Sequence, residues 1–359
     1  MPLKRLCFVG WADHVHVERW AGFFARQGYE VSVISFSGLG TYPPGVRQYR
    51  VGLHGRGPRW HRARLRYLLW RLRPDAVHVH WAHFAVSVRA VWRGPLAVTA
   101  WGSDIYRRDR FEAGQWARLG STLRATELIT CDSQDLADSM CREFSLAAER
   151  VKVVQWGVDT DLFNMTGANL RAELGLVGRE VVLSARNFTP LYNQGTVVRA
   201  FARLRENRPQ VFLLMKSYGG DPEYIAKIRG EIDALGLNAD VRIIEAMPYE
   251  QMPALYRSAD VTLSIPLSDA TPMSLFEAMA SGSPCVVCDL PSLREWVTDG
   301  HTGTLVDAQS VEAVAQALDV ALTPSPARDA MLQAARQLVV DKASQRAHMA
   351  VIAQFYADM

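Results

Sequence analysis

The residues that could do chemistry gather between positions 269 and 284, in the run Asp-Ala-Thr-Pro-Met-Ser-Leu-Phe-Glu-Ala-Met-Ala-Ser-Gly-Ser-Pro. Thr271 can cap a helix, Pro272 suits the first helical position, and Gly282 suits a left-handed stop. These signals predict a helix from about residue 272 to 281, with one carboxylate just outside its start and a second inside it. Such a helix can hold a ligand that carries an anion next to hydroxyl groups.

The two carboxylates, Asp269 and Glu277, bracket the start of this predicted helix. The amides of Met273 and Ser274 have no acceptor within the helix, and with the helix dipole they form a site for phosphate oxygens. At ~1.5 Å rise per residue, Glu277 lies ~9 Å along the axis from Thr271, roughly the reach from a diphosphate to a ribose. A diphosphate between two hydroxyl-rich groups suits this segment. The alternative is an ordinary surface helix with one acidic residue.

The elements that must position this segment are short apolar runs that alternate with helical patterns. A first series lies at 6–9, 31–34, 76–79, 96–99, 128–130 and 151–154, and a second at 181–184, 212–215, 241–244, 261–264, 285–287 and 303–306. This βαβ alternation predicts an α/β protein with two doubly wound, Rossmann-like domains of parallel strands. Because such sheets bind ligands at the carboxyl ends of their strands, we expect the domains to face each other across a cleft.

The domain boundary is expected in the segment 155–178, which is rich in Gly, Asp and Asn. We therefore expect an N-terminal domain over residues 1–160 and a C-terminal domain over 165–335. The end of the chain reads as helices, and a final helix over about 340–359 is expected to pack back on the first domain.

Composition narrows the classes of function. The chain has 359 residues, 49% hydrophobic and 21% charged, and its net charge of +3 is too small to indicate a nucleic-acid partner. The five scattered cysteines favour a reducing cytoplasm over a disulfide framework. Cys285 and Cys288 have redox or metal spacing, but they lie in a buried-strand pattern and are expected in the core.

Two further absences in the sequence are informative. No signal-peptide pattern stands at the N-terminus and no apolar run reaches 18 residues, so we expect a cytoplasmic protein, at most peripheral to a membrane. No Gly-x-Gly-x-x-Gly follows the first predicted strand, where Gly10-Trp-Ala-Asp-His-Val stands instead. This counts against a nicotinamide or flavin enzyme.

Five short motifs stand in a recognisable order along the chain. They are Gly157-Val-Asp-Thr-Asp-Leu-Phe163, Ser184-Ala-Arg186, Tyr256-Arg-Ser-Ala-Asp260, the run from Asp269 to Pro284, and the run from Val297 to Val306. Together they resemble glycosyltransferase family 4, retaining enzymes of the GT-B fold that move a sugar from a nucleotide diphosphate donor. The run from Asp269 to Pro284 is similar to the family's Glu-x7-Glu and the Ala-Met-Ala-x-Gly-x-Pro that follows it.

The resemblance implies that a nucleotide-sugar donor binds the second domain and a hydroxyl-bearing acceptor binds the first. It implies that Glu277 holds the donor ribose, while Met273 and Ser274 contribute backbone contacts. Arg186 would neutralise the leaving phosphate, and the loop around Met247 would contact the base, with UDP-sugars favoured and GDP-sugars as the alternative. The implied reaction retains the anomeric configuration and needs neither a metal ion nor a cofactor. The expected catalytic set is Asp269, Glu277 and Arg186.

Three positions depart from the family's pattern. Asp269 is one methylene shorter than the usual Glu, so its expected contact with sugar hydroxyls requires a closer approach. Asn193 stands where the family often carries a lysine for the diphosphate, and Lys216 is either the replacement charge or a solvated lysine. Trp101 replaces a histidine; it cannot accept a proton but can stack on a sugar face, and Asp104 remains an expected contact.

These departures keep two alternatives open. One is a nucleotide-sugar epimerase of the same fold, which needs general bases around the sugar and no acceptor. The other is a catalytically degenerate donor-binding subunit of a transferase complex.

Histidines cluster near two strand ends of the first domain. His78 and His80 would share one face of a strand, where they could bind a metal, contact a ligand or lie in the core. No carboxylate or cysteine completes a metal set, so we expect no metal and favour ligand contact by His80 or His83, with core histidines as the alternative. His14 and His16 follow the first strand and are expected acceptor contacts.

The segment from Arg56 to Arg73 carries seven arginines and a stripe of leucines at helical spacing. One interpretation is a basic amphipathic helix that contacts an anionic membrane or an anionic acceptor. The other is a helix that packs its leucines inward and leaves its arginines in water.

Overall fold

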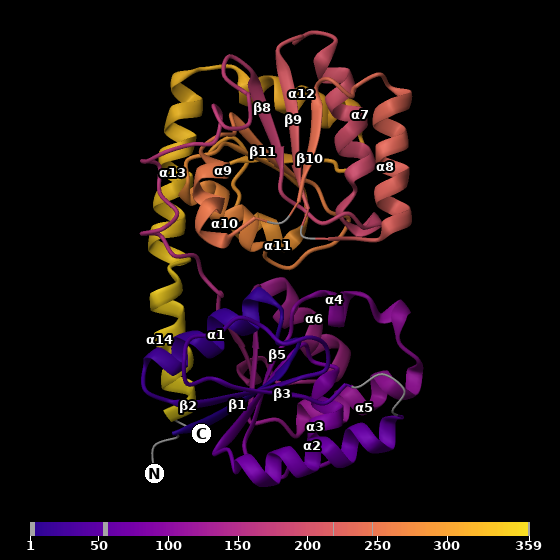
Figure 1. Ribbon diagram of the computed structural model, residues 1–359, viewed down its shortest axis with the longest axis vertical. Helices are drawn as coiled ribbons and strands as arrows, with labels where there is room; N and C mark the ends of the chain where they lie inside the picture. Colours follow the sequence, from indigo (N-terminus) through magenta and orange to yellow (C-terminus); the bar gives the residue numbers. More distant parts are fainter. Residues whose placement is uncertain (1–3, 53–56, 218, 246, 358–359) are drawn as a thin grey trace. The chain divides into compact units, whose positions relative to one another are not determined.

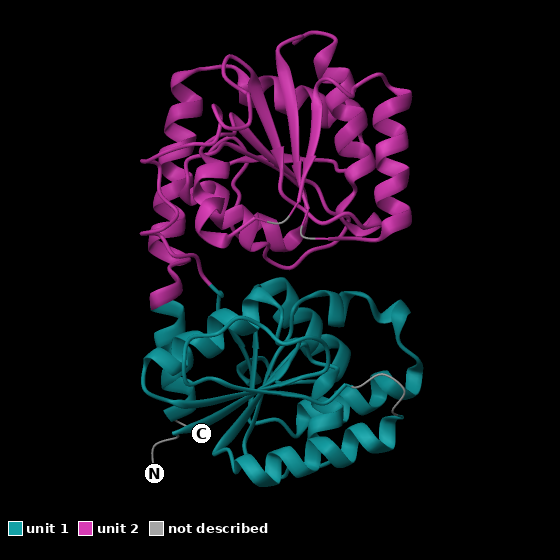
Figure 2. Cartoon of the chain, in the orientation of Figure 1, with its two compact units in different colours: residues 1–156, 347–359 teal, residues 157–346 magenta. Residues whose placement is uncertain are grey.

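The computed structural model describes residues 4–52, 57–217, 219–245 and 247–357. The chain divides into two compact units (Figure 2). Unit 1 comprises Met1–Trp156 and Ala347–Met359, and unit 2 comprises Gly157–Arg346. Each unit is built on its own parallel sheet, with helices on both faces (Figure 1).

Unit 1 contains a sheet of seven parallel strands in the order β3-β2-β1-β4-β5-β6-β7. The strands are β1 Arg5–Gly10, β2 Glu30–Ser35, β3 Arg47–Arg50, β4 Ala76–His80, β5 Leu96–Thr99, β6 Leu128–Cys131 and β7 Val151–Val153. Six of them coincide with the predicted apolar runs. All of these six except β7 are almost entirely buried because helices cover both faces of the sheet, which is why they read as continuous apolar runs.

The strand β3 was not predicted from the sequence. Its residues, Arg-Gln-Tyr-Arg, are polar and only partly buried. It pairs in parallel with β2 alone, at the edge of the sheet. An edge strand needs less apolar surface than a central one, so the hydrophobic pattern carries no signal for it.

The helices of unit 1 lie on the two faces of its sheet. They are α1 Val15–Arg26, α2 Pro58–Leu72, α3 Phe84–Arg89, α4 Ser103–Tyr106, α5 Ala113–Arg124, α6 Gln134–Phe144 and the last helix α14, Gln345–Ala357. Figure 1 shows α1 and α14 on one face and α2, α3 and α5 on the other. Tyr356 of α14 is fully buried, and its hydroxyl hydrogen-bonds to His78 in the centre of the sheet.

Unit 2 contains six parallel strands in the order β10-β9-β8-β11-β12-β13. The strands are β8 Glu180–Ser184, β9 Val211–Lys216, β10 Val241–Ile244, β11 Val261–Ser264, β12 Cys285–Cys288 and β13 Thr304–Val306. The helices are α7 Gln194–Arg205, α8 Pro222–Ala234, α9 Met252–Tyr256, α10 Met273–Ala280, α11 Pro291–Arg294, α12 Val311–Leu322 and α13 Pro326–Lys342. The predicted α/β class, with two doubly wound parallel sheets, is confirmed.

The helix predicted over residues 272–281 is confirmed as α10, with a correction at its start. Thr271 does not cap it. Pro272 occupies the capping position with an extended backbone (ψ 124°), so the helix begins one residue later than predicted and has no side-chain cap. At the other end, Gly282 has φ 76°, the left-handed stop that the sequence predicted.

Cys285 and Cys288 lie at opposite ends of β12, both buried and both free thiols. Their side chains are part of the core, as predicted. Within the described ranges, no helix combines the length and the apolar character needed to cross a bilayer.

Candidate functional site

The predicted donor residues of unit 2 gather where its strand order reverses. Strands β8 and β11 are neighbours, and the chain runs outward from them in opposite directions, toward β10 on one side and β13 on the other. Arg186 follows β8, and Asp269 and α10 follow β11. In doubly wound sheets, ligands bind at the carboxyl edge at such a reversal.

Arg186 is the centre of this cluster. Its Nη2 forms a salt bridge with Asp269, and its Nη1 donates to the hydroxyl of Ser274 at 3.0 Å. The guanidinium also lies over the Tyr192 ring, 4.5 Å from the ring centroid. Burial lowers the pKa of Arg186, but Asp269 and Tyr192 outweigh it and the net shift is upward, so the residue stays a permanent cation. The structure therefore brings Arg186, Asp269 and α10 together, and their roles toward a donor stay predictions.

Glu277 and Lys216 form a second, more deeply buried part of the cluster. Glu277 is 5% exposed and accepts a hydrogen bond from the Tyr256 hydroxyl at 3.2 Å. Lys216, the last residue of β9, is fully buried. Burial lowers its pKa to about 7, while the nearby Glu277 carboxylate acts in the opposite direction. Lys216 is thus a buried lysine near Glu277 rather than a solvated surface lysine.

The N-terminus of α10 presents amides to the same place. The Leu275 amide donates to the Pro272 carbonyl at 3.0 Å, but the amides of Met273 and Ser274 donate to no backbone carbonyl among the described residues. The Ser292 hydroxyl donates to the Asp269 carbonyl at 2.8 Å and fixes the preceding loop. Two open amides beside a guanidinium are a binding arrangement for phosphate oxygens.

Two predicted donor contacts are placed differently. The Asn193 side chain is engaged locally: its amide donates to the Ala308 carbonyl at 2.7 Å and its oxygen accepts from Thr196 at 2.9 Å. It therefore holds the start of α7 against the loop after β13. Met247 is half-buried in the loop that follows β10. That loop is at the carboxyl edge of the same sheet.

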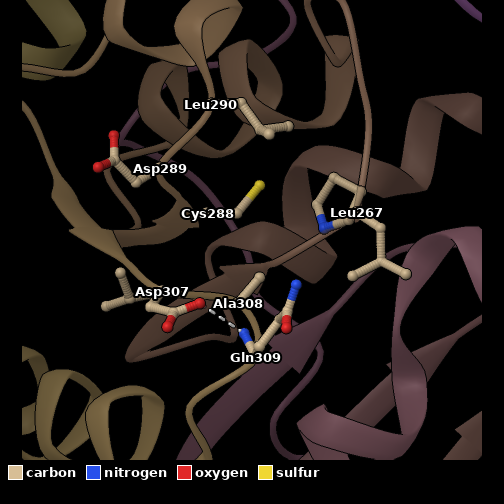
Figure 3. Close-up of a pocket in the computed structure, with 9 residues that line it drawn as sticks. Leu267, Cys288, Asp289, Leu290, Asp307, Ala308 and Gln309 are labelled. Carbon is tan, nitrogen blue, oxygen red and sulfur yellow. Dashed lines mark hydrogen bonds between the residues drawn. The ribbon is translucent and has the colours of Figure 1, made fainter. Parts of the chain in front are cut away.

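A hollow of about 300 Å³ lies along this edge, beyond the ends of β11, β12 and β13 (Figure 3). Its lining residues are Pro266, Leu267, Cys288, Asp289, Leu290, Val306, Asp307, Ala308 and Gln309. Burial raises the pKa of the Cys288 thiol to about 12, and the charge of Asp269 adds to the shift. The thiol is therefore an inert part of the wall. This hollow was not predicted from the sequence, because its lining comes from three separate loops.

In unit 1, the predicted acceptor residues belong to an aromatic cluster at the carboxyl edge of its sheet. The Trp101 ring lies 4.4 Å from His14, 5.5 Å from His16 and 5.5 Å from Trp156, measured between centroids. His16 also contacts Trp156 at 3.8 Å, and Trp11 lies 5.7 Å from Trp101. These rings follow the ends of three strands, β1, β5 and β7, so the fold brings together residues far apart in the sequence.

The imidazoles of this cluster are neutral near neutral pH. Burial lowers the pKa of His14 to about 4 and holds the pKa values of His16 and His80 well below their usual range. His14 caps α1 by accepting from the His16 amide at 3.3 Å. Within the described part of the chain, His16 Nδ1, the Trp101 and Trp156 indole nitrogens and both ring nitrogens of His80 have no hydrogen-bond partner.

His80 is fully buried, and its ring lies 6.0 Å from that of the partly buried Trp101 between centroids. It is therefore a core histidine, the alternative that the sequence left open, rather than the favoured ligand contact. His83 stacks on Phe111 at 3.5 Å and its Nε2 hydrogen-bonds to the Asp104 carbonyl at 3.0 Å. Both histidines are therefore held by the protein's own side chains.

Asp104 also serves the protein's own backbone. It is fully buried, and its two carboxylate oxygens accept from the amides of Ala82 (2.7 Å) and Trp101 (2.9 Å). Burial raises its pKa to about 6, although these hydrogen bonds oppose the shift. Asp104 thus ties the loop after β5, which carries Trp101, to the loop after β4.

His78 is a core histidine. Its two ring nitrogens hydrogen-bond to the Tyr356 and Thr99 hydroxyls, the latter at 2.7 Å. In the part of the chain that the structure describes, no group of three His, Cys, Asp or Glu side chains is arranged to hold a metal ion.

Sequence reasoning missed three members of the aromatic cluster, Trp11, Trp81 and Trp156. Trp11 and Trp81 are in contact at 4.6 Å between centroids. A signal was available: Trp11, Trp81 and Trp101 each follow the end of a strand within two residues, and Trp156 follows within three. Tryptophans that recur after parallel strands must meet at the carboxyl edge of the sheet.

Comparison with known proteins agrees with this geometry. A family model described as "Glycosyltransferase Family 4" matches residues 14–162, and one described as "Glycosyl transferases group 1" matches residues 168–338. The first covers most of unit 1, and the second covers most of unit 2.

Individual relatives are more distant. A D-inositol 3-phosphate glycosyltransferase of Corynebacterium aurimucosum is 28% identical over 310 residues, 79% of this chain and 72% of that protein. Its counterpart in Corynebacterium glutamicum is 26% identical over 272 residues, 71% of this chain; the match spans 65% of that protein's length.

Solved structures share the fold. The Anabaena protein Alr3699/HepE, crystallised in complex with UDP-glucose, superimposes with a TM-score of 0.85 at 17% sequence identity, covering 99% of this chain and 100% of that one. Two family models match successive parts of the chain, and each part contains one doubly wound parallel sheet. The chain therefore belongs to the glycosyltransferases of group 1 and family 4 and has the GT-B fold.

Proposed function

We propose that this protein transfers a sugar from a nucleotide diphosphate donor to a hydroxyl group of an acceptor, with retention of the anomeric configuration. One observation carries the proposal: Arg186, Ser274 and the open amides of α10 meet where the strand order reverses, with Glu277 buried further along the same helix. A diphosphate flanked by a sugar and a ribose fits this set of groups. Family membership supports the same conclusion.

The donor is proposed to bind unit 2. Arg186, with its forked donors, and the Met273 and Ser274 amides would bind the diphosphate. Lys216 would add a second positive charge from β9. Glu277 would accept hydrogen bonds from the ribose hydroxyls, and the loop containing Met247 would contact the base.

UDP-sugars are the favoured donors, and GDP-sugars are the alternative. One structural neighbour was crystallised with UDP-glucose. A relative from Mycolicibacterium smegmatis, 30% identical over 209 residues, is named as GDP-mannose-dependent. Titration with UDP and GDP distinguishes the two bases.

The chemistry is proposed to be leaving-group stabilisation and positioning. The bond between the anomeric carbon and the diphosphate oxygen breaks, and the acceptor oxygen bonds to the same face of that carbon. The acceptor's proton passes to the departing phosphate oxygen, whose charge Arg186 and the α10 amides stabilise. Asp269 would orient the sugar hydroxyls near the reacting carbon.

The acceptor is proposed to bind unit 1 at the layer formed by Trp101, His14 and His16. Aromatic faces can pack on the apolar face of a sugar or of a cyclic polyol. The indole nitrogen of Trp101 and Nδ1 of His16 are buried and have no hydrogen-bond partner among the described residues, so a side-chain rotation would be needed to offer them to its hydroxyls. Asp104 would act as a positioning residue, because its carboxylate holds the Trp101 amide.

The experiment is incubation with a panel of UDP- and GDP-sugars, with and without sugar or cyclic polyol acceptors, followed by NMR. Release of nucleoside diphosphate together with a glycoside of unchanged anomeric configuration is the expected result. Interconversion of the donor sugars would instead establish the epimerase. Donor binding without turnover on any acceptor would favour the degenerate subunit, and a product of inverted configuration would contradict the proposed mechanism.

A further inference from the structure

The helix α2 lies at the outside of unit 1 (Figure 1), and its outer face carries exposed basic and aromatic side chains. We call it the basic face and define it as Arg59, Arg62, Arg66, Tyr67 and Trp70 of α2 together with Arg93, which follows α3. These residues line an open hollow of about 850 Å³, along with the small side chains of Ala63, Ala90 and Val91. No carboxylate contributes to the lining.

One face of α2 packs into unit 1, and the opposite face is exposed to solvent. The leucines that gave the sequence its amphipathic pattern, Leu65, Leu68, Leu69 and Leu72, are buried in unit 1. The inward-packing interpretation is therefore correct for the leucines. Arg59, Arg62, Arg66 and Trp70 recur at helical spacing on the opposite side and are exposed.

The large aromatic side chains of this face are unusually exposed. Trp70 is 67% exposed and Tyr67 is 53% exposed, and their rings lie 6.1 Å apart. A tryptophan and a tyrosine that are this exposed among arginines are not explained by packing within unit 1. Such rings are typical of the boundary between lipid headgroups and acyl chains.

The arginines of the basic face have no acidic partner among the described residues. None of the salt bridges in the described ranges involves Arg59, Arg62, Arg66 or Arg93. Arg64 is different, since it donates to the Arg50 carbonyl at 2.7 Å.

The surrounding sequence has the same charge asymmetry. From residue 31 to residue 103 the chain contains eleven arginines and one carboxylate, Asp75. That carboxylate is paired with Arg5. Arg47 and Arg89 pair with Glu30 and Glu127, which lie outside this stretch, but the arginines of the basic face form no salt bridge among the described residues. Their positive charge therefore favours an anionic partner. Arg56, at the edge of this segment, lies outside the described residues.

We propose that the basic face docks unit 1 on the anionic surface of a phospholipid bilayer. The guanidinium groups bind headgroup phosphates around the hollow, and Trp70 and Tyr67 insert their rings at the headgroup level. A polyanion in solution would satisfy the arginines but would leave no role for two exposed rings. Docking through this face goes beyond the transfer reaction and does not depend on it.

The test is co-sedimentation of the full chain with vesicles of phosphatidylcholine alone and of phosphatidylcholine mixed with phosphatidylglycerol. Binding is expected only to the mixed vesicles and is expected to weaken as salt is added. Because each arginine near an anionic surface strengthens binding by roughly five-fold, the double variant Arg62→Gln with Arg66→Gln should bind about 25-fold more weakly. Trp70→Ala should also weaken binding to the mixed vesicles. Brominated acyl chains should quench the tryptophan fluorescence of the wild type more than that of Trp70→Ala.

The matched control is Lys227→Gln with Arg229→Gln on α8, which removes the same charge from exposed positions of unit 2. It should bind the mixed vesicles like the wild type. Unchanged circular dichroism spectra and thermal unfolding would show that every variant is folded. Equal binding to neutral vesicles, or equal losses in the two double variants, would overturn the proposal. Arginine-dependent binding of soluble heparin, without binding to mixed vesicles, would assign the face to a polyanion instead.

Discussion

One of the partners of Arg186 within unit 2, Asp269, competes with the proposed ligand. Its salt bridge to Asp269 is largely buried, with the two side chains 10% and 19% exposed. A diphosphate bound to Arg186 must share the guanidinium with this carboxylate or displace it. Asp269 is therefore expected to weaken diphosphate binding while it assists turnover of the sugar.

This competition gives a prediction with opposite signs for binding and turnover. Asp269→Asn keeps the shape of the side chain and removes its charge. We expect UDP or GDP to bind at least as tightly as to the wild type, because the competing charge is gone. We expect kcat for the nucleotide sugar to fall by roughly ten-fold or more, since hydrogen bonds to a charged group contribute about 1.5–3 kcal/mol. Calorimetry and steady-state kinetics measure the two quantities separately, and an unchanged kcat would remove Asp269 from the catalytic set.

Lys216 gives a prediction about pH. Burial lowers its pKa to about 7, so the side chain is a cation below that pH and loses its charge above it. Its contribution to diphosphate binding should therefore be present at acid pH and be lost as pH rises. The diphosphate itself titrates, so the informative quantity is the ratio of Kd values for Lys216→Met and the wild type. This ratio should be largest below pH 7 and fall at higher pH. A bound anion stabilises the protonated lysine, so it shifts the fall of the ratio to higher pH. A ratio independent of pH would mean that Lys216 does not bind the diphosphate.

At the scale of elements, the end of α10 is a point where backbone geometry restricts the sequence. Gly282 has φ 76°, and a Cβ added there would lie 2.9 Å from Met165 Cγ. Gly282→Ala should lower the free energy of unfolding by about 1–2 kcal/mol for the left-handed conformation alone. Gly230, within α8, has open space around it, so Gly230→Ala should raise stability by about 0.4–1 kcal/mol. Urea unfolding measures the free energy of unfolding of both variants. Equal changes in the two variants would show that the left-handed conformation of Gly282 does not matter for stability.

The sequence predicted the buried elements better than the exposed ones. Central strands such as β1 and β11 are continuous apolar runs because helices cover both of their faces. The edge strand β3 has no such pattern, and the start of α10 was placed one residue early because Pro272 is extended. Both differences come from local backbone or edge effects that apolar periodicity does not record.

At the scale of the whole molecule, the two candidate sites differed in how far the sequence could predict them. The unit 2 site lies largely in one continuous segment, so the spacing from Asp269 to Glu277 already indicated its chemistry. The unit 1 cluster is assembled from four strand ends, and Trp156 stands 145 positions after Trp11. Composition and spacing did not bring these residues together. The burial of Asp104 and His80 likewise followed only from three-dimensional packing.

We propose that unit 2 holds a nucleotide-sugar donor site with Glu277 at its ribose end. The most direct measurement is calorimetric titration of UDP, GDP and ADP into the wild type, Glu277→Ala, and the control Glu173→Ala, which changes an exposed carboxylate of the same unit. We predict that UDP or GDP binds the wild type and the control with the same affinity. Glu277→Ala should bind roughly ten-fold or more weakly, because it loses charge-assisted hydrogen bonds. Failure of every nucleoside diphosphate to bind, or equal binding by Glu277→Ala, would contradict the claim.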